Sequence, residues 1–211
     1  MLPEAECRAL PVVCDERSSV VITHRNRHGD RYYLHEGKTK TGKAKYFFSR
    51  KREGVLAKSI PDGFEVYETP NAMVLLRRVV PCVVTSEETA IVTDAVRQNP
   101  KAKGAIVEMK GDSITVHMPS FDLDESVDEL TADYPFTDRV QLRGVLKRSV
   151  NYMPAMRFVL QDEKSRQYQT ERWCYAGSID DWIPVESPGP LPKLARMLCR
   201  HLGRESFFEL M

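Results

Sequence analysis

The feature that most constrains the fold is a series of short strand-like runs, each followed by residues that favour turns. Four such runs in the first eighty residues are rich in aromatic or β-branched residues: 31–36 (RYYLHE), 45–50 (KYFFSR), 64–68 (FEVYE) and 73–78 (MVLLRR). The first two flank a segment of lysine, threonine and glycine, and the last two flank a Thr-Pro-Asn-Ala turn. Short connections between such runs are typical of antiparallel hairpins. We therefore expect two hairpins, with a short helical turn between them in residues 53–60.

Beyond Pro81 the spacing of apolar residues predicts both helices and strands. Thr85 followed by Glu88 is a capping-box pattern, which predicts a helix over residues 86–98. The other expected elements are a hairpin in residues 104–118, strands at 140–147, 155–161 and 167–175, a capped turn at 178–182, and a final helix over about 190–202. Gly203 lies where a glycine commonly ends a helix.

Together these patterns predict an α+β protein in two parts. An irregular leader, residues 1–18, precedes a small basic domain of antiparallel hairpins, residues 19–80. After a boundary near Pro81, residues 81–211 are expected to form a larger β-rich domain with a C-terminal helix. This second domain contains an acidic connection, residues 120–138. The length of 211 residues is compatible with one large domain or two small ones.

The charge of the chain is strongly segregated, although the net formal charge is only +1. Residues 24–58 contain eleven lysines and arginines against three acids, which gives a formal charge of +8. Residues 108–138 contain nine acids against one lysine, which gives −8. A second, smaller basic surface on the C-terminal helix consists of Lys193, Arg196 and Arg200. Clustered cations are typical of proteins that bind polyanions.

Alternation along the first hairpin predicts which side chains face solvent, because the opposite register would bury lysines. The expected core-facing residues are Tyr32, Leu34, Ala44, Tyr46 and Phe48. The expected outward residues are Arg31, Tyr33, His35, Lys43, Lys45, Phe47, Ser49 and Lys51. Cations neutralise phosphates and flat rings stack bases, so this face favours binding of single-stranded nucleic acid. The predicted contact residues are Arg25, Arg27, Arg31, Tyr33, Lys43, Lys45, Phe47 and Lys51.

The sequence therefore favours a non-enzymatic protein that binds DNA or RNA, preferably single-stranded, and that needs no cofactor. A rival interpretation is that the acidic connection docks on the basic residues, within the chain or in a second copy. The chain would then be a protein–protein adaptor or would self-associate.

A metal-dependent nuclease is a further alternative. Glu108 and Lys110 end an apolar strand-like run, and in such nucleases an acid holds the metal while a lysine polarises the attacking water. The second acid that this chemistry requires could be Asp94, which lies on a predicted helix. An exposed hairpin end would carry the same residue types without any catalytic role.

Two other patterns do not lead to a cofactor assignment. Gly37, Gly42 and Lys43 have the spacing of a phosphate-binding loop, but Ala44 stands where a serine or threonine would bind magnesium, and the sequence that follows is strand-like. Residue types that bind zinc occur at Cys7, Cys14, His24 and His28. The two cysteines are more widely spaced than in the usual tight zinc-binding turn, so no metal is assigned.

The remaining composition indicates a cytoplasmic protein. No apolar run approaches the roughly 18 residues that a membrane-spanning helix requires, so no membrane partner is expected. The N-terminal residues lack the long apolar core of a signal peptide. The five cysteines are odd in number and scattered, which is typical of a reducing compartment.

Overall fold

The structure, a computed structural model, describes residues 21–176 and 179–210. These residues form eleven strands, all paired antiparallel, and four α-helices, so the protein belongs to the α+β class that the sequence predicts. They separate into two compact units, residues 21–80 and 81–210. Each unit has its own hydrophobic core. The predicted leader, residues 1–18, lies outside the described residues.

Residues 21–80, the N-terminal unit, contain a three-stranded sheet and a separate two-stranded hairpin. The sheet has the order β1–β2–β3, with the bounds Thr23–Arg25, Arg31–Lys38 and Ala44–Ser49. The second hairpin joins β4 to β5, with the bounds Phe64–Glu68 and Val74–Arg78. Both hairpins predicted from the alternating runs are therefore confirmed.

The core of the N-terminal unit lies on the inward face of the sheet. It consists of Ile22, Leu34 and Ala57, with Tyr46, Phe48, Ile60 and Leu76 packed against them. Leu34 is fully buried and lies directly opposite Phe48, so the inward direction predicted for Leu34, Tyr46 and Phe48 is confirmed. Tyr32 is half-buried, whereas Ala44 is exposed because it begins β3.

The helical turn expected in residues 53–60 is wrong, because this segment is extended. The amide of Ala57 donates to the carbonyl oxygen of Leu34 at 2.9 Å, and the amide of Glu36 donates to the carbonyl oxygen of Val55 at 3.0 Å. Residues 55–57 therefore pair with the same edge of β2 that pairs with β1. Backbone groups at a sheet edge need partners, and this tertiary pairing outweighs a weak local preference for helix.

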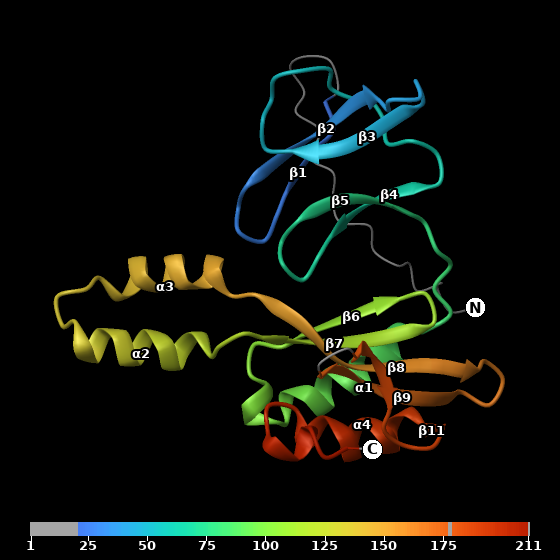
Figure 1. Cartoon of the computed structure of the whole chain (residues 1–211), viewed down its shortest axis with the longest axis vertical. Helices are drawn as coiled ribbons and strands as arrows, with labels where there is room; N and C mark the ends of the chain where they lie inside the picture. The colour runs from blue at the N-terminus through green and yellow to red at the C-terminus, as the bar shows by residue number, and fades with distance from the viewer. Residues whose placement is uncertain (1–20, 177–178, 211) are drawn as a thin grey trace. The chain divides into compact units, whose positions relative to one another are not determined.

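Residues 81–210, the C-terminal unit, are built on an antiparallel sheet of order β10–β9–β8–β7–β6, and β11 pairs with β9. The bounds are β6 Ile106–Lys110, β7 Ser113–Pro119, β8 Tyr152–Asp162, β9 Gln167–Ala176, β10 Ile179–Pro184 and β11 Gly189–Pro190. Helices α1, Ser86–Arg97, and α4, Leu191–Leu198, cover one face (Figure 1). Val92 of α1, Leu194 of α4 and Phe158 of β8 meet in the core.

The start of α1 has the capping box that the sequence predicts. The Thr85 hydroxyl accepts a hydrogen bond from the amide of Glu88 at 3.2 Å, and the Glu88 carboxylate accepts one from the amide of Thr85 at 2.9 Å. The same carboxylate accepts from Nε of Arg166 at 2.8 Å. Burial opposes ionisation of Glu88, but the hydrogen bonds from Arg166 and Thr85 outweigh it and lower the pKa of Glu88. These contacts attach the helix to the β8–β9 turn.

An arm of two helices is inserted between β7 and β8 (Figure 1). Helix α2 comprises Leu123–Asp133 and helix α3 comprises Arg139–Ser149. The predicted acidic connection, residues 120–138, thus contains a helix, and the strand predicted at 140–147 is wrong.

The valines of residues 140–147 favour a strand locally, but two other features decide for a helix. The Asp138 side chain caps α3 by accepting from two backbone amides, those of Val140 and Gln141. The two half-buried residues of α3, Leu142 and Leu146, are four positions apart, which is the helical spacing.

The end of the chain differs from the prediction in one element and agrees in another. The capped turn expected at 178–182 is wrong, because residues 179–184 form β10; Ser178 lies outside the described residues. The predicted C-terminal helix is present as α4, extended by a 3₁₀ turn at Cys199–His201. Gly203 follows with φ of +72°, and a Cβ there would lie 2.6 Å from the Lys101 carbonyl oxygen. No helix in the described part of the chain is long and apolar enough to cross a membrane.

Candidate nucleic-acid interface

One face of the β1–β3 sheet, called the basic face below, carries Arg25, Arg31, Tyr33, Lys45 and Phe47. The strand register places them together: Arg25 is opposite Arg31, Tyr33 is opposite Ser49, and Phe47 is opposite His35. Residues directly opposite in antiparallel strands share a face, and alternation puts this face opposite to the one that carries Leu34. The sheet thus brings together five of the eight residues predicted to contact nucleic acid.

The two arginines of the basic face lie directly across from each other. Arg25 and Arg31 are both exposed, and neither has an ion-pair partner among the described residues. Like charges directly opposite in neighbouring strands repel and are destabilising. An anion bound between the two guanidinium groups would remove this repulsion.

Phe47 provides a flat ring on the same face. Its ring is stacked on the imidazole of His35, with 5.2 Å between centroids and 12° between planes, and its side chain is 43% exposed. The Lys45 ammonium lies 5.6 Å from the Phe47 centroid. A cation and an exposed ring are therefore in contact on this surface.

His35 was expected to face solvent, and this prediction is wrong: the residue is only 5% exposed. Its Nε2–H group donates to the carbonyl oxygen of Lys51 at 2.9 Å, and Gly54 lies against the ring. The segment that follows β3 therefore covers His35 and holds the ring on which Phe47 is stacked. His35 therefore positions the Phe47 ring on the basic face without being exposed itself.

Lys43 and Lys51 lie beyond the two ends of β3 and are both exposed. Lys43 belongs to the turn between β2 and β3, which is closed by hydrogen bonds from the Thr39 amide to the Lys43 carbonyl at 2.8 Å and from the Gly42 amide to the Thr39 carbonyl at 2.9 Å. A strand follows this turn. The segment lacks the helix N-terminus that a phosphate-binding loop requires, so it is a hairpin turn that presents Lys43.

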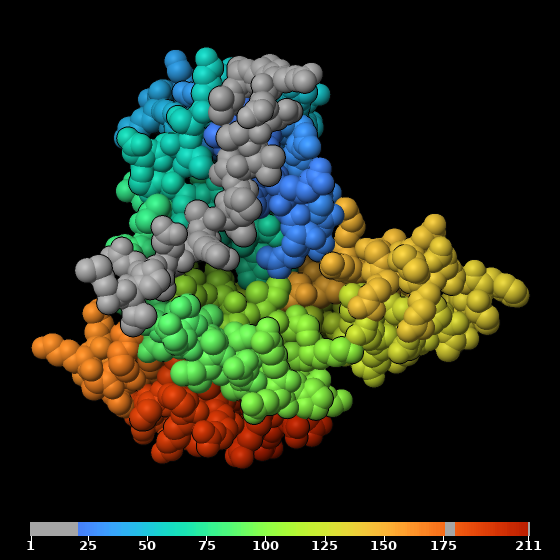
Figure 2. Space-filling model, turned by 180° about the vertical axis from the view of Figure 1, so that it is seen from behind, coloured from blue at the N-terminus to red at the C-terminus, as the bar shows by residue number. Residues whose placement is uncertain are grey.

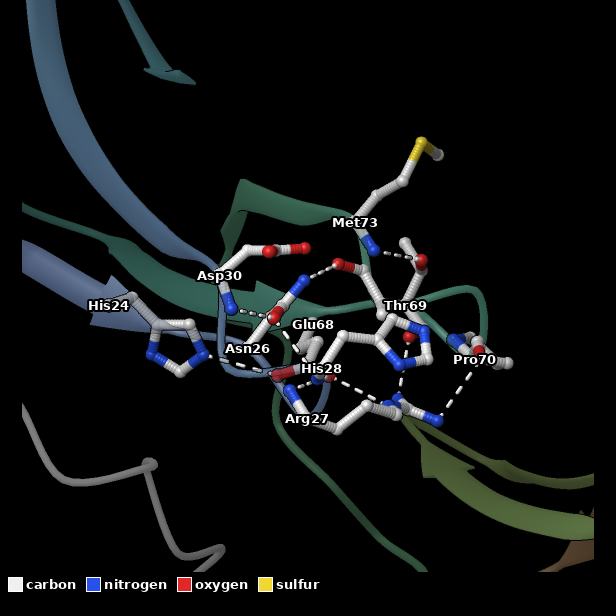
Figure 3. Close-up of polar contacts among 10 residues, drawn as sticks. His24, Asn26, Arg27, His28, Asp30, Glu68, Thr69, Pro70 and Met73 are labelled. Atoms are coloured by element: carbon white, nitrogen blue, oxygen red, sulfur yellow. Dashed lines mark hydrogen bonds and ion pairs between the residues drawn. The ribbon is translucent and has the colours of Figure 1, made fainter. Parts of the chain in front are cut away.

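Arg27 has a structural role in the N-terminal unit. Its guanidinium donates to the Glu68 carboxylate at 2.7 Å and to the carbonyl oxygens of Thr69 and Pro70 at 2.7 and 3.1 Å (Figure 3). Glu68 also accepts from His24 at 3.2 Å. Burial opposes ionisation of Glu68, but the hydrogen bonds from Arg27 and His24 outweigh it and lower its pKa. Arg27 joins the β1–β2 loop to the β4–β5 hairpin, so fewer of its donors remain for a phosphate.

The zinc-ligand types of the sequence are not brought together within the described residues. Cys7 and Cys14 lie outside these residues, and His24 is hydrogen-bonded to Glu68. His28 lies in the β1–β2 loop and is half-buried. Residues 21–176 and 179–210 contain no group of three or more histidine, cysteine, aspartate or glutamate side chains that could hold a metal ion.

The nuclease candidates are separated by the sheet of the C-terminal unit. Val107 and Met109 pack into the core under α1, so Glu108 between them points to the other face. Asp94 lies on α1 itself and forms an exposed ion pair with Arg97 at 3.5 Å. Glu108 instead accepts a hydrogen bond from His117 Nε2 at 3.1 Å. The structure thus does not bring Asp94 and Glu108 to one metal site.

A second group of interacting side chains, which was not predicted from the sequence, lies on the same face of the sheet as Glu108. Arg157 forms an ion pair with Glu171, and its guanidinium lies 4.4 Å from the ring centroid of Trp182. Trp173 meets Trp182 edge to face at 5.1 Å. These contacts join β8 to β9, β9 to β10 and, across β9, β8 to β10, so they could be predicted only after the strand order and register are known.

The second basic surface that the sequence predicts is present on α4. Lys193, Arg196 and Arg200 are exposed and line a shallow hollow of about 500 Å³ together with Pro190, Pro192 and Met197. Arg200 donates to His201 at 3.2 Å. This surface has cations but no exposed aromatic ring among the residues that line it.

Comparison of the chain with protein-family models, with curated proteins and with solved structures found no match. The functional argument therefore depends on the geometry described above.

Proposed function

We propose that the N-terminal unit binds single-stranded nucleic acid on the basic face, without catalysing a reaction. The observation that carries the proposal is that Arg25 and Arg31 lie directly opposite each other, without an ion-pair partner among the described residues, on the same sheet face as the exposed ring of Phe47. Phosphates are anions that a pair of guanidinium groups can bind with several hydrogen bonds each. Bases attached to those phosphates have flat faces that stack on aromatic side chains.

The ring of Phe47 favours single strands over duplexes as the ligand. In a duplex the faces of the bases are already stacked on one another, whereas in a single strand they are accessible. Stacking of one base on an aromatic side chain contributes about 1–3 kcal/mol. His35 fixes the orientation of the Phe47 ring, so less conformational freedom is lost when a base binds.

The charge of the surroundings supports the same ligand. In addition to the basic face and Arg27, the exposed cations of residues 24–58 are Lys38, Lys40, Lys43, Arg50, Lys51, Arg52 and Lys58. The potential of such a cluster attracts a polyanion and orients it before contact. Because the contacts would be made to the backbone and to base faces, we expect weak dependence on base sequence.

Replacement of Lys43 and Lys45 tests the proposal. We expect Lys43→Gln/Lys45→Gln to weaken binding of a fluorescent oligonucleotide several-fold and to make the salt dependence less steep by about 1.4 in the slope of log K against log salt, since each single-strand phosphate contact contributes about 0.7. Fluorescence anisotropy at several salt concentrations measures both effects.

The matched control is Lys193→Gln/Arg196→Gln, which removes the same charge from the exposed α4 surface of the other unit. The control is expected to bind as the unchanged protein does. Equal weakening by both double variants would show that overall charge, and not the basic face, determines binding, and would contradict the proposal.

A further inference from the structure

The arm formed by α2 and α3 stands out from the sheet of its unit in both views (Figures 1 and 2). Helix α3 contains no buried residue, although four of its eleven residues are apolar. Leu142 and Leu146 are half-buried, whereas Val140 and Val145 are 80% and 63% exposed. Phe136, in the connection between the helices, is fully exposed. Exposed apolar residues at this density indicate a surface that another molecule covers.

The charges of the arm are divided between its two helices. Helix α2 contains five acids and no base, and helix α3 contains four bases and no acid. Two ion pairs join them, Arg139 to Asp128 and Arg143 to Asp124. The remaining acids of α2, which have no ion-pair partner among the described residues, are Glu125, Glu129 and Asp133. On α3, Lys147 is exposed and likewise has no such partner within the described chain.

This division of charge restricts what can cover the arm. A nucleic acid or an anionic lipid surface would be repelled by the acids of α2, and a purely basic protein would be repelled by α3. A second arm of the same kind meets both requirements, because its acidic helix is complementary to α3 and its basic helix to α2. We propose that the arm is a self-association surface on which the arm of a second copy packs.

A two-fold axis between the two copies would determine how the two arms pack. In a two-fold dimer the same patch is used on both copies, so each contact between the α2 of one copy and the α3 of the other occurs twice. The four helices then form an antiparallel group in which Val140 and Val145 are shielded from water in both copies. Helices of eleven residues are marginally stable without such packing, so the contact would also stabilise the arm.

Sedimentation equilibrium of the full chain over a wide range of protein concentration tests the proposal. We expect a reversible monomer–dimer equilibrium. Val140→Gln/Val145→Gln is expected to raise the dimer dissociation constant by about tenfold or more, because two apolar contacts are lost in each copy. The control is Val79→Gln/Val80→Gln, which makes the same change at two exposed valines outside the arm and is expected to leave the constant unchanged.

Charge reversal tests the antiparallel arrangement. Glu129→Lys alone is expected to weaken the dimer, and addition of Lys147→Glu is expected to restore part of the affinity. A chain that stays monomeric throughout, or a Val140→Gln/Val145→Gln variant that dimerises as the unchanged chain does, would overturn the proposal. Failure of Lys147→Glu to restore affinity would overturn the pairing of α2 with α3. Circular dichroism would establish that each variant retains its secondary structure.

Discussion

Phe47 has two neighbours that give its ring different properties. The His35 ring is stacked on it, which fixes its orientation, and the Lys45 ammonium is placed near it, which adds a positive charge beside an apolar surface. Lys45 has a long, flexible side chain, so it can move to a phosphate while a base takes its place against the ring. Under the proposed function, Lys45 would contact the phosphate and Phe47 the base of the same nucleotide.

A Phe47→Leu variant separates stacking from hydrophobic burial. Leucine keeps an apolar side chain against His35 but has no flat ring. We expect it to weaken binding of a single strand by about 5- to 150-fold, which corresponds to about 1–3 kcal/mol of stacking, and to change duplex binding far less. Parallel anisotropy titrations with a single strand and with the matching duplex measure the difference.

The matched control is Phe208→Leu, which changes a 71% exposed phenylalanine outside the basic face. It should leave both affinities unchanged. Equal losses for single strand and duplex in Phe47→Leu would contradict a stacking role for Phe47.

At the scale of secondary structure, the hairpins follow directly from local sequence. Turn residues between alternating runs fix β2–β3 and β4–β5, and the cost of burying lysines fixes the inward face of β3. The capping box fixes the start of α1. These features depend on residues close together in the chain, so they could be predicted without knowledge of the rest of the molecule.

The elements that were predicted incorrectly depend on distant partners. Residues 53–60 are extended because part of this segment pairs with β2. Residues 140–147 are helical because Asp138 caps α3 and because the apolar residues at helical spacing are half-buried where α3 contacts α2. The burial of His35 has a related cause, since Gly54, which lies against its ring, belongs to the segment that was expected to be helical. In each case a tertiary contact outweighs a local preference of a few tenths of a kcal/mol per residue.

Because Glu88 and Arg166 attach α1 to the β8–β9 turn, the free energy of unfolding should depend on the ionisation of Glu88 and therefore on pH. Glu88 has a lowered pKa in the folded protein, so its contribution to stability is present above its unfolded pKa, near 4.5, and is lost as the pH falls through the lower folded value. Glu88→Gln is expected to reduce the free energy of unfolding by about 2 kcal/mol at pH 7. The difference from the unchanged protein should shrink below about pH 4.5.

Urea denaturation of both proteins at neutral and acidic pH measures this difference in the free energy of unfolding. The contributions of the other carboxylates cancel in the comparison because both chains contain them. Glu163→Gln, at an exposed position in the β8–β9 turn, is the control and should have little effect at either pH. A difference between Glu88→Gln and the unchanged chain that persists at acidic pH would argue against the ion pair with Arg166 as its cause.

At the scale of the whole molecule, the net charge of +1 conceals two regions of opposite charge in different units. Part of the acidic charge is already neutralised within its own unit. Hydrogen bonds from Lys103 and Arg143 lower the pKa of Asp124 to about 2, and Arg139 is paired with Asp128. By contrast, Arg25 and Arg31 have no ion-pair partner among the described residues. Under the proposed function an anionic ligand would bind these two arginines, whereas the acids of α2 that have no ion-pair partner in the described chain would pair with the arm of a second copy.

The most direct test of the account is the salt dependence of single-strand binding by the full chain. If Arg25, Arg31, Lys43 and Lys45 each contact one phosphate, log K should fall with log salt at a slope of about −3, so that affinity drops roughly 60-fold between about 50 and 200 mM salt. Anisotropy titrations of one fluorescent oligonucleotide at several salt concentrations give this slope. A steep, linear decrease is the predicted result. Failure to bind at low salt, or an affinity that does not change with salt, would contradict the proposed function.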